Sequence, residues 1–241
     1  MFIGLALSLS NPSGVAGPAE WAGLTPLADW DPDDAVLSGS TIVTVPDASG
    51  NGYTLTGAVG NEPTIVTADA NFNGHDTMDF AILSSQRATF PDVGYTSGLL
   101  SAVIVCRSTK VTTGYAISLS NEDYGAYNNT GSGTWGSFLS ADATAIQSAA
   151  VSPTVPSILL STVSGGTQRF YRNSATEAGN AASNGVAAAS GGVVGNYANT
   201  FSVFGLVGQV ARVILFGSLL SSGERAAVMA ALGTKYGITI V

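Results

Sequence analysis

The sequence predicts an all-β protein, an antiparallel β-sandwich with one short helix near its C-terminal end. Short runs of β-branched and aromatic residues recur along the chain, and turn-forming Gly, Asn and Ser residues separate them. Only 10% of the residues are charged and 45% are hydrophobic, so Ser, Thr, Asn and Gly must form most of the surface. This surface is typical of β-proteins, because exposed helix faces usually carry Glu, Lys and Arg.

The N-terminal segment is expected to be an attachment arm. It begins with an apolar run that is too short to span a bilayer, and no Lys or Arg precedes it, which disfavours a signal peptide. The apolar residues of this arm are Phe2, Ile3, Leu5, Leu7 and Leu9. A linker rich in Pro and Gly follows at residues 11–18. We therefore expect residues 1–18 to be an arm and linker, and residues 19–241 to be one β-sandwich domain.

The predicted strands are short and closely spaced. In chain order they are residues 41–45, 53–56, 64–67, 77–80, 99–106, 115–119, 135–139, 158–163, 168–171, 192–195, 201–205 and 207–216. No helical periodicity separates them, which excludes a parallel α/β architecture. Two stretches of low complexity, residues 121–136 and 175–192, are expected to be long surface loops.

One helix is predicted near the C-terminal end. Ser221 and Glu224 form a capping-box pattern, and Gly237 stands where a C-terminal cap belongs. The apolar residues expected on one helix face are Ala227, Val228, Ala231 and Leu232. We expect this helix to pack on the edge of the sandwich and residues 238–241 to form a last short strand.

Several motifs resemble a known family. Trp30 followed by the segment PDASGNGYTL at 46–55 is similar to the opening of that family. Residues 208–216, residues 219–225, Leu232 and residues 235–237 are similar to its closing part. On these residues the chain resembles the laminin-G-like, concanavalin-A-like lectin/glucanase jelly roll of bacteriophage and bacterial surface proteins. The resemblance covers about residues 30–237 and implies jelly-roll topology. The chain departs from the pattern at Ser174, where the family usually has Gly.

The composition argues against nucleic-acid binding, a reactive cysteine and a structural zinc site. The net charge is −8 and the eight basic residues are scattered, whereas a nucleic-acid surface needs clustered Lys and Arg. The lone Cys106 lies in an apolar run and is expected to be an inert core thiol. One Cys and one His cannot supply a structural zinc site.

The sequence predicts that the protein is not an enzyme. The glucanases of the family that this chain resembles carry an E-x-D-x-x-E arrangement of acidic residues, and this sequence contains no such run. The densest acidic group is Asp31, Asp33 and Asp34, which we expect to be a solvated loop beside Pro32. His75 is expected to be a turn residue, since no Gly-x-Ser-x-Gly nucleophile motif occurs to work with it.

The segment 47–52 allows two interpretations. Asp47, Ser49 and Asn51 stand at alternate positions, as oxygen ligands do in a calcium loop. The carboxylate expected at position 12 is missing, because Ala58 stands there. The alternative is a tight turn in which Asp47 accepts backbone N–H groups. No other cofactor is expected.

The best candidates for ligand contact lie in the Asn- and Tyr-rich stretch. They are Tyr124, Tyr127, Asn128, Asn129 and Trp135. Aromatic side chains with amides nearby can hold sugars, and exposed tyrosines also build protein interfaces. Trp135 begins a predicted strand, so the core is its alternative place.

Together, the resemblance and the arm imply a non-enzymatic structural or adhesive protein on the surface of a phage particle. It would decorate the capsid or form a tail- or fibre-associated domain, attached through its arm to other virion proteins and assembled as a homo-oligomer. The alternative is a carbohydrate-binding module that recognises host-surface glycans. A glycan hydrolase is the third hypothesis.

Overall fold

The structure is a computed structural model that describes residues 23–81, 85–95, 99–109, 113–119, 124–129, 134–139, 144–147, 153–183, 191–197 and 204–241. The expected arm, with Phe2, Ile3, Leu5, Leu7 and Leu9, lies outside the described residues. Within them, seventeen strands pair into one continuous sheet that folds into two layers. Every pairing between these strands is antiparallel, and one α-helix follows the last strand. The all-β antiparallel prediction is confirmed.

The first layer is built around the two longest strands, which pair along their whole length. In spatial order it contains β15 (Gly179–Ala182), β14 (Thr167–Arg172), β13 (Ser157–Val163), β8 (Leu100–Ser108) and β17 (Gly208–Phe216). The far edge of β17 is shared by β1 (Ala28–Trp30) and β6 (His75–Phe80), and β5 (Thr64–Asp69) pairs with β6.

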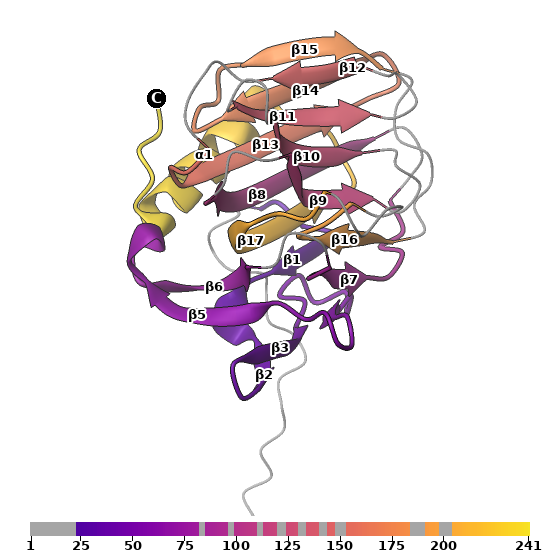
Figure 1. Ribbon diagram of the computed structural model, residues 1–241. Helices are drawn as coiled ribbons and strands as arrows, with labels where there is room; N and C mark the ends of the chain where they lie inside the picture. The colour runs from indigo at the N-terminus through magenta and orange to yellow at the C-terminus, as the bar shows by residue number, and fades with distance from the viewer. Residues whose placement is uncertain are drawn as a thin grey trace, which may run out of the picture.

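The second layer faces the first across the core (Figure 1). In spatial order it contains β12 (Thr144–Gln147), β11 (Thr134–Leu139), β10 (Gly125–Asn129), β9 (Gly114–Leu119), β16 (Gly192–Val194), β7 (Ala88–Phe90), β4 (Leu55–Gly57), β3 (Thr41–Val45) and β2 (Val36–Ser38). A single pairing, Thr41 with Thr64, joins β3 to β5 and so connects the layers. Two 3-10 helices, η2 (Pro32–Asp34) and η3 (Ala70–Phe72), lie in the connections around β2 and β6.

Strand β8 shows how one sequence run serves two apolar clusters. Successive side chains of a strand point to opposite faces. Ile104 and Cys106 therefore lie in the core between the layers, whereas Val103 and Val105 lie in a second cluster on the opposite face. We call that second group the helix-side cluster. The continuous apolar run of β8 thus reflects burial on both faces, and burial raises the pKa of the Cys106 thiol, which fits the expected inert core cysteine.

Helix α1 (Ser222–Tyr236) covers the helix-side cluster. The predicted capping box is present: the Ser221 hydroxyl accepts from the Glu224 N–H, and the Glu224 carboxylate accepts from the Ser221 N–H. Gly237 ends the helix in the left-handed conformation, at φ 66°. Figure 1 shows α1 on the side of the first layer that faces away from the second. The helix therefore covers a face of the sheet, whereas the sequence predicted that it would pack on an edge.

The buried helix residues differ from the predicted face. They are Val228, Met229, Leu232, Gly233 and Tyr236. Of the predicted face, Val228 and Leu232 are buried, whereas Ala227 is exposed and Ala231 is half-buried.

Several expected loops and strands also differ. Residues 121–136 contain β10 and the start of β11, and residues 175–192 contain β15, so neither is only a loop. Residues 238–241 form no strand. Instead, the Val241 N–H donates to the Asn173 carbonyl and holds the end of the chain beside β14. Of the predicted strand 201–205, residues 201–203 lie outside the described residues.

Candidate functional site

Two of the residues predicted to contact a ligand are core residues. Trp135 has no exposed surface and Tyr124 is 1% exposed, and both belong to the cluster between the layers. Trp135 points inward from β11, so it occupies the core position that the sequence allowed as its alternative. A side chain without exposed surface cannot contact a sugar in this conformation, so the structure corrects the prediction at these two positions.

Tyr127 lies on the other side of the second layer. Its neighbour Ala126 is in the core, opposite Ile117 of β9, and the register shifts between Ala126 and Tyr127. Tyr127 is therefore directed to the outer face, where it pairs with Tyr115. Asn128 and Asn129 continue β10, and their predicted role in ligand contact stays a prediction.

Four aromatic rings come together on this outer face, and we call them the aromatic cluster: Tyr115, Tyr127, Tyr197 and Phe204. The Tyr115 ring is central. Its centroid lies 5.4 Å from that of Tyr127, 4.7 Å from that of Tyr197 and 6.2 Å from that of Phe204. Tyr197 and Phe204 also meet edge to face at 5.8 Å. Three of the four side chains are half-buried, and Tyr127 is 7% exposed.

Two glycines allow this cluster to form. A Cβ atom at Gly125 would stand 2.6 Å from the Tyr115 ring, so only Gly lets that ring lie over β10. A Cβ atom at Gly114 would stand 2.7 Å from the Gly205 carbonyl oxygen. The close approach at Gly114 brings residues 204–205 against β9, where the Tyr115 N–H donates to the Phe204 carbonyl.

The cluster has the chemistry of a binding surface. Ligand sites in proteins are lined by aromatic side chains with a few polar groups. Tyrosine supplies an apolar ring face and a hydroxyl at its edge, and both can contact a sugar ring. The sequence prediction found Tyr127 and missed Tyr115, Tyr197 and Phe204. Tyr115 could have been found from the sequence, because it begins a predicted strand next to the Tyr-rich stretch. Tyr197 and Phe204 could not, because their positions depend on long-range pairing.

The segment 47–52 is a hydrogen-bonded turn. The Asp47 carboxylate accepts from the backbone N–H groups of Asp29, Ser49 and Tyr53 at 2.9 to 3.0 Å, and from the Ser49 hydroxyl at 2.8 Å. The Asn51 amide donates to the Leu27 carbonyl. The side chains proposed as calcium ligands therefore anchor the turn to the start of β1, which matches the alternative interpretation. Among the described residues no group of three or more His, Cys, Asp or Glu could hold a metal ion.

The acidic group at 31–34 is not the solvated loop that the sequence predicts. Arg212 of β17 is 2% exposed and binds both oxygens of Asp29 at 2.8 Å and Asp31 at 3.1 Å. Lys235 of α1 binds Asp31 at 2.5 Å. Burial lowers the pKa of Arg212, but its bonds with Asp29 outweigh burial and raise that pKa. Arg212, Asp29 and Asp31 form a buried ion-pair network on the helix-covered face, and the half-buried Lys235 extends it.

His75 also differs from its prediction. It begins β6, its Nδ1 lies 2.7 Å from an Asp33 carboxylate oxygen, and its ring meets the Tyr236 ring edge to face at 5.1 Å. Burial raises the pKa of Asp33. The hydrogen bond from the Asp76 N–H and the contact with His75 outweigh burial, so that the pKa is lowered. Asp34 lies at the end of η2 and is exposed. Asp33 and His75 thus connect η2 to β6 and α1.

The part of the chain that the structure describes contains no helix both long and apolar enough to cross a membrane. No protein-family model and no curated protein matches the sequence.

Solved structures share the fold. The sialidase of Trypanosoma rangeli in complex with 2,3-difluorosialic acid matches with a TM-score of 0.62 at 13% identity, over 86% of this chain and 32% of the sialidase. A mutant of the same sialidase displaying trans-sialidase activity matches with a TM-score of 0.60 at 15% identity, over 94% of this chain and 35% of the other.

Botulinum neurotoxin type C, whose cell entry is dependent upon interaction with two ganglioside molecules, matches with a TM-score of 0.58 at 10% identity, over 80% of this chain and 51% of the toxin chain. The chain thus spans about a third of the sialidases and half of the toxin chain. At these identities the likeness shows the fold alone, a β-sandwich consistent with a concanavalin-A-like jelly roll.

Proposed function

We propose that this chain is a non-enzymatic adhesive module that binds glycans through the aromatic cluster. The observation that carries the proposal is the half-buried position of Tyr115, Tyr197 and Phe204, with Tyr127 stacked on Tyr115, on an outer sheet face that no helix of the described residues covers. Such rings offer apolar faces for a sugar and hydroxyl groups for its polar edge.

The similar structures support the class of ligand by analogy. A Trypanosoma rangeli sialidase is solved in complex with sialic acid, and botulinum neurotoxin type C interacts with gangliosides. Both are proteins that engage glycans and share this fold. Fold-level analogy raises the expectation for a ligand class and assigns no site, so the aromatic cluster must carry the assignment.

A non-catalytic role is supported by the position of the acidic side chains. Glycoside hydrolysis commonly needs two carboxylates that flank the bond to be cleaved. Asp29 and Asp31 stand close together, but both are buried and bound to Arg212. A saccharide-cleavage assay with the purified chain tests this part of the proposal, and any turnover would contradict it.

Glycan binding is tested by screening the purified chain on a glycan array and titrating the best ligand into variants by calorimetry. Tyr115→Ala and Tyr197→Ala each remove a ring from the cluster, and we expect each to weaken binding about tenfold or more. Thermal unfolding of each variant shows whether the domain remains folded.

Tyr171→Phe is the matched control. Tyr171 is buried under α1, and its hydroxyl has no hydrogen-bond partner among the described residues. Loss of this oxygen should leave stability and affinity unchanged. Affinity that is equal in wild type, Tyr115→Ala and Tyr197→Ala would refute the role of the aromatic cluster.

The finer expectation, a place on a phage particle as part of a homo-oligomer, stays a prediction. The arm that would attach the chain lies outside the described residues. Deletion of residues 1–10 should abolish incorporation into particles and leave a folded domain. Unchanged incorporation would rule out attachment through the arm.

A further inference from the structure

A small pocket lies where helix α1 stops covering the first layer. Leu160 of β13 pairs with Tyr171 of β14 and with Val103 of β8, and this apolar row lies under the helix. Two residues further along β13, Thr162 pairs with Arg169 on the same sheet face. The face therefore changes from apolar to polar at the beginning of the helix.

The pocket has a volume of about 210 Å³. One wall is the hairpin between β13 and β14, which supplies Thr162, Ser164, Thr167 and Arg169. Ser164 is held in place, because its hydroxyl accepts from the Thr167 N–H at 3.2 Å and donates to the Thr167 carbonyl at 3.1 Å. The hairpin wall is thus fixed by its own hydrogen bonds.

The opposite wall comes from Leu219 and Leu220, which precede α1, and from Arg225 in its first turn. The Arg225 guanidinium lies 4.6 Å above the centre of the Tyr171 ring and donates to the Leu220 carbonyl at 2.7 Å. Its Nε is buried and has no hydrogen-bond partner among the described residues. Arg225 is therefore positioned by the fold and keeps one N–H donor that no described residue uses.

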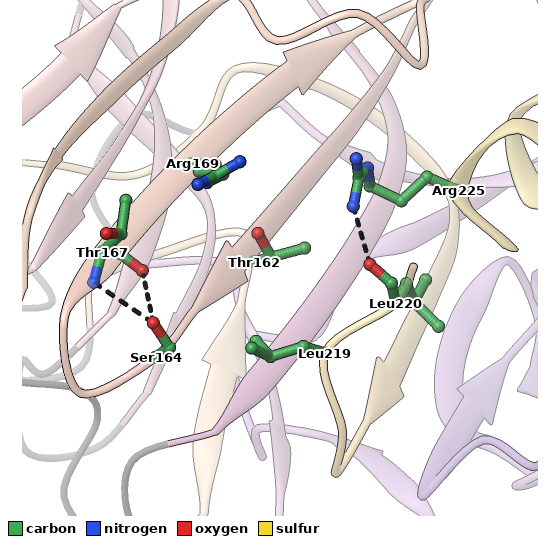
Figure 2. Close-up of a pocket in the computed structure, with 7 residues that line it drawn as sticks. All are labelled: Thr162, Ser164, Thr167, Arg169, Leu219, Leu220 and Arg225. Carbon is green, nitrogen blue, oxygen red and sulfur yellow. Dashed lines mark hydrogen bonds between the residues drawn. The ribbon is translucent and has the colours of Figure 1, made fainter. Parts of the chain in front are cut away.

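Two arginines thus face one small space. Figure 2 shows Thr162 between the side chains of Arg169 and Arg225. The Arg169 side chain is 51% exposed, and its guanidinium lies 3.4 Å from the Glu177 carboxylate. An ion pair in contact with solvent contributes little energy, so Glu177 holds Arg169 only weakly. In a chain with eight basic and sixteen acidic residues, two guanidinium groups at one pocket form a local positive site.

We propose that this arginine pocket, lined by Arg169, Arg225 and Thr162, binds a small oxyanion group, either a carboxylate or a sulfate carried by a ligand. Guanidinium groups present donors in a planar fork that matches the oxygens of such groups, and the bonds are strengthened by charge. The site lies on the first layer, whereas the aromatic cluster lies on the second, so it does not depend on the proposed function.

The test is a titration of the full-length, ¹⁵N-labelled chain followed by NMR, with glucuronate, sulfate and glucose at constant ionic strength. We expect saturable shifts of the Thr162, Thr167 and Leu220 amides with glucuronate, with sulfate or with both, and none with glucose. The two anions distinguish a carboxylate ligand from a sulfated one.

Arg169→Gln is the informative variant, because this half-exposed side chain can be changed without emptying the core. We expect it to raise the dissociation constant for the anion about tenfold. Arg87→Gln removes the same charge outside the pocket and should leave the constant unchanged. The proposal is wrong if neither anion gives saturable shifts, or if both variants weaken binding equally.

The two proposals fail independently. Tyr115→Ala should leave anion binding in the arginine pocket unchanged, and Arg169→Gln should leave the binding of a neutral glycan unchanged. If Tyr115→Ala abolished the amide shifts around Thr162, the arginine pocket would not be a separate site.

Discussion

The outer faces of the two layers differ in what covers them. On the first layer, Val103, Val105 and Ile214 point outward and lie under α1. On the second layer, Tyr115 and Tyr127 point outward and meet other aromatic rings instead of a helix. The covered face contributes to stability through burial of apolar surface. No helix among the described residues covers the outer face of the second layer, which we call the open face, and its half-buried rings form the proposed ligand site.

The buried charged residues also lie on the face that α1 covers. Arg212, Asp29 and Asp31 are on the covered face and almost completely buried. Removing one partner from a buried ion pair leaves an uncompensated charge, whereas an exposed pair contributes little. Changes on the covered face should therefore alter stability first, and changes on the open face should alter binding first.

The largest effect is expected for Arg212→Met, which removes the cation between two buried carboxylates. We expect the free energy of unfolding to fall by about 3–5 kcal/mol. Urea denaturation measures it. The control is Arg169→Met in the exposed pair with Glu177, for which we expect a change of at most about 1 kcal/mol. Equal losses in both variants would contradict the difference between buried and exposed charge.

A smaller effect on stability is expected for Gly125→Ala on the open face. The added Cβ would stand 2.6 Å from the Tyr115 ring, so the ring must move. Such overpacking costs about 1–3 kcal/mol. Because the ring is displaced, glycan affinity should fall as it does in Tyr115→Ala. Gly165→Ala is the control, since nothing lies within 4 Å of a Cβ at that position. Unchanged glycan affinity in Gly125→Ala would show that binding does not depend on the position of the Tyr115 ring.

The smallest effect concerns pH. The pKa of Asp33 is lower in the folded protein than in the unfolded chain. As the pH falls below about 4, the unfolded chain takes up the proton first, so the stability that Asp33 contributes is lost. Thermal unfolding between about pH 5 and 3 should show a shallower decline in Asp33→Asn than in wild type.

Asp79 should behave in the opposite way, since burial raises its pKa despite the hydrogen bond from Gln209. In the folded protein it takes up its proton first, so falling pH relieves a destabilising charge. Asp79→Asn should therefore steepen the decline. Parallel curves for the wild type and both variants would show that neither carboxyl group contributes to the pH dependence.

Local features of the fold could be predicted from the sequence. The capping box at Ser221 and Glu224 depends on four consecutive residues, and the buried run of β8 depends on nine. The capping box appears where it was predicted, and β8 spans 100–108 where 99–106 was predicted. The direction of Tyr127 could not be predicted, because the register shift beside it changes which side chains of β10 face the core. The core position of Trp135 was the alternative that its place at the start of a predicted strand allowed.

The ion-pair network was beyond prediction for another reason. Asp29 and Arg212 are 183 residues apart, and nothing near Asp31 in the sequence indicates a cation. A short acidic stretch with Pro has the composition of a solvated loop, and only the pairing of β1 with β17 brings the arginine to it. The aromatic cluster was missed for the same reason, because Tyr115 meets Tyr197 through tertiary contacts.

The most direct test of the central claim is a crystal structure of the chain with the best glycan from the array. We predict a sugar ring stacked on Tyr115 or Tyr197 on the open face of the second layer. A sugar bound elsewhere, with the aromatic cluster bare, would contradict it. So would an array on which no glycan binds the folded chain.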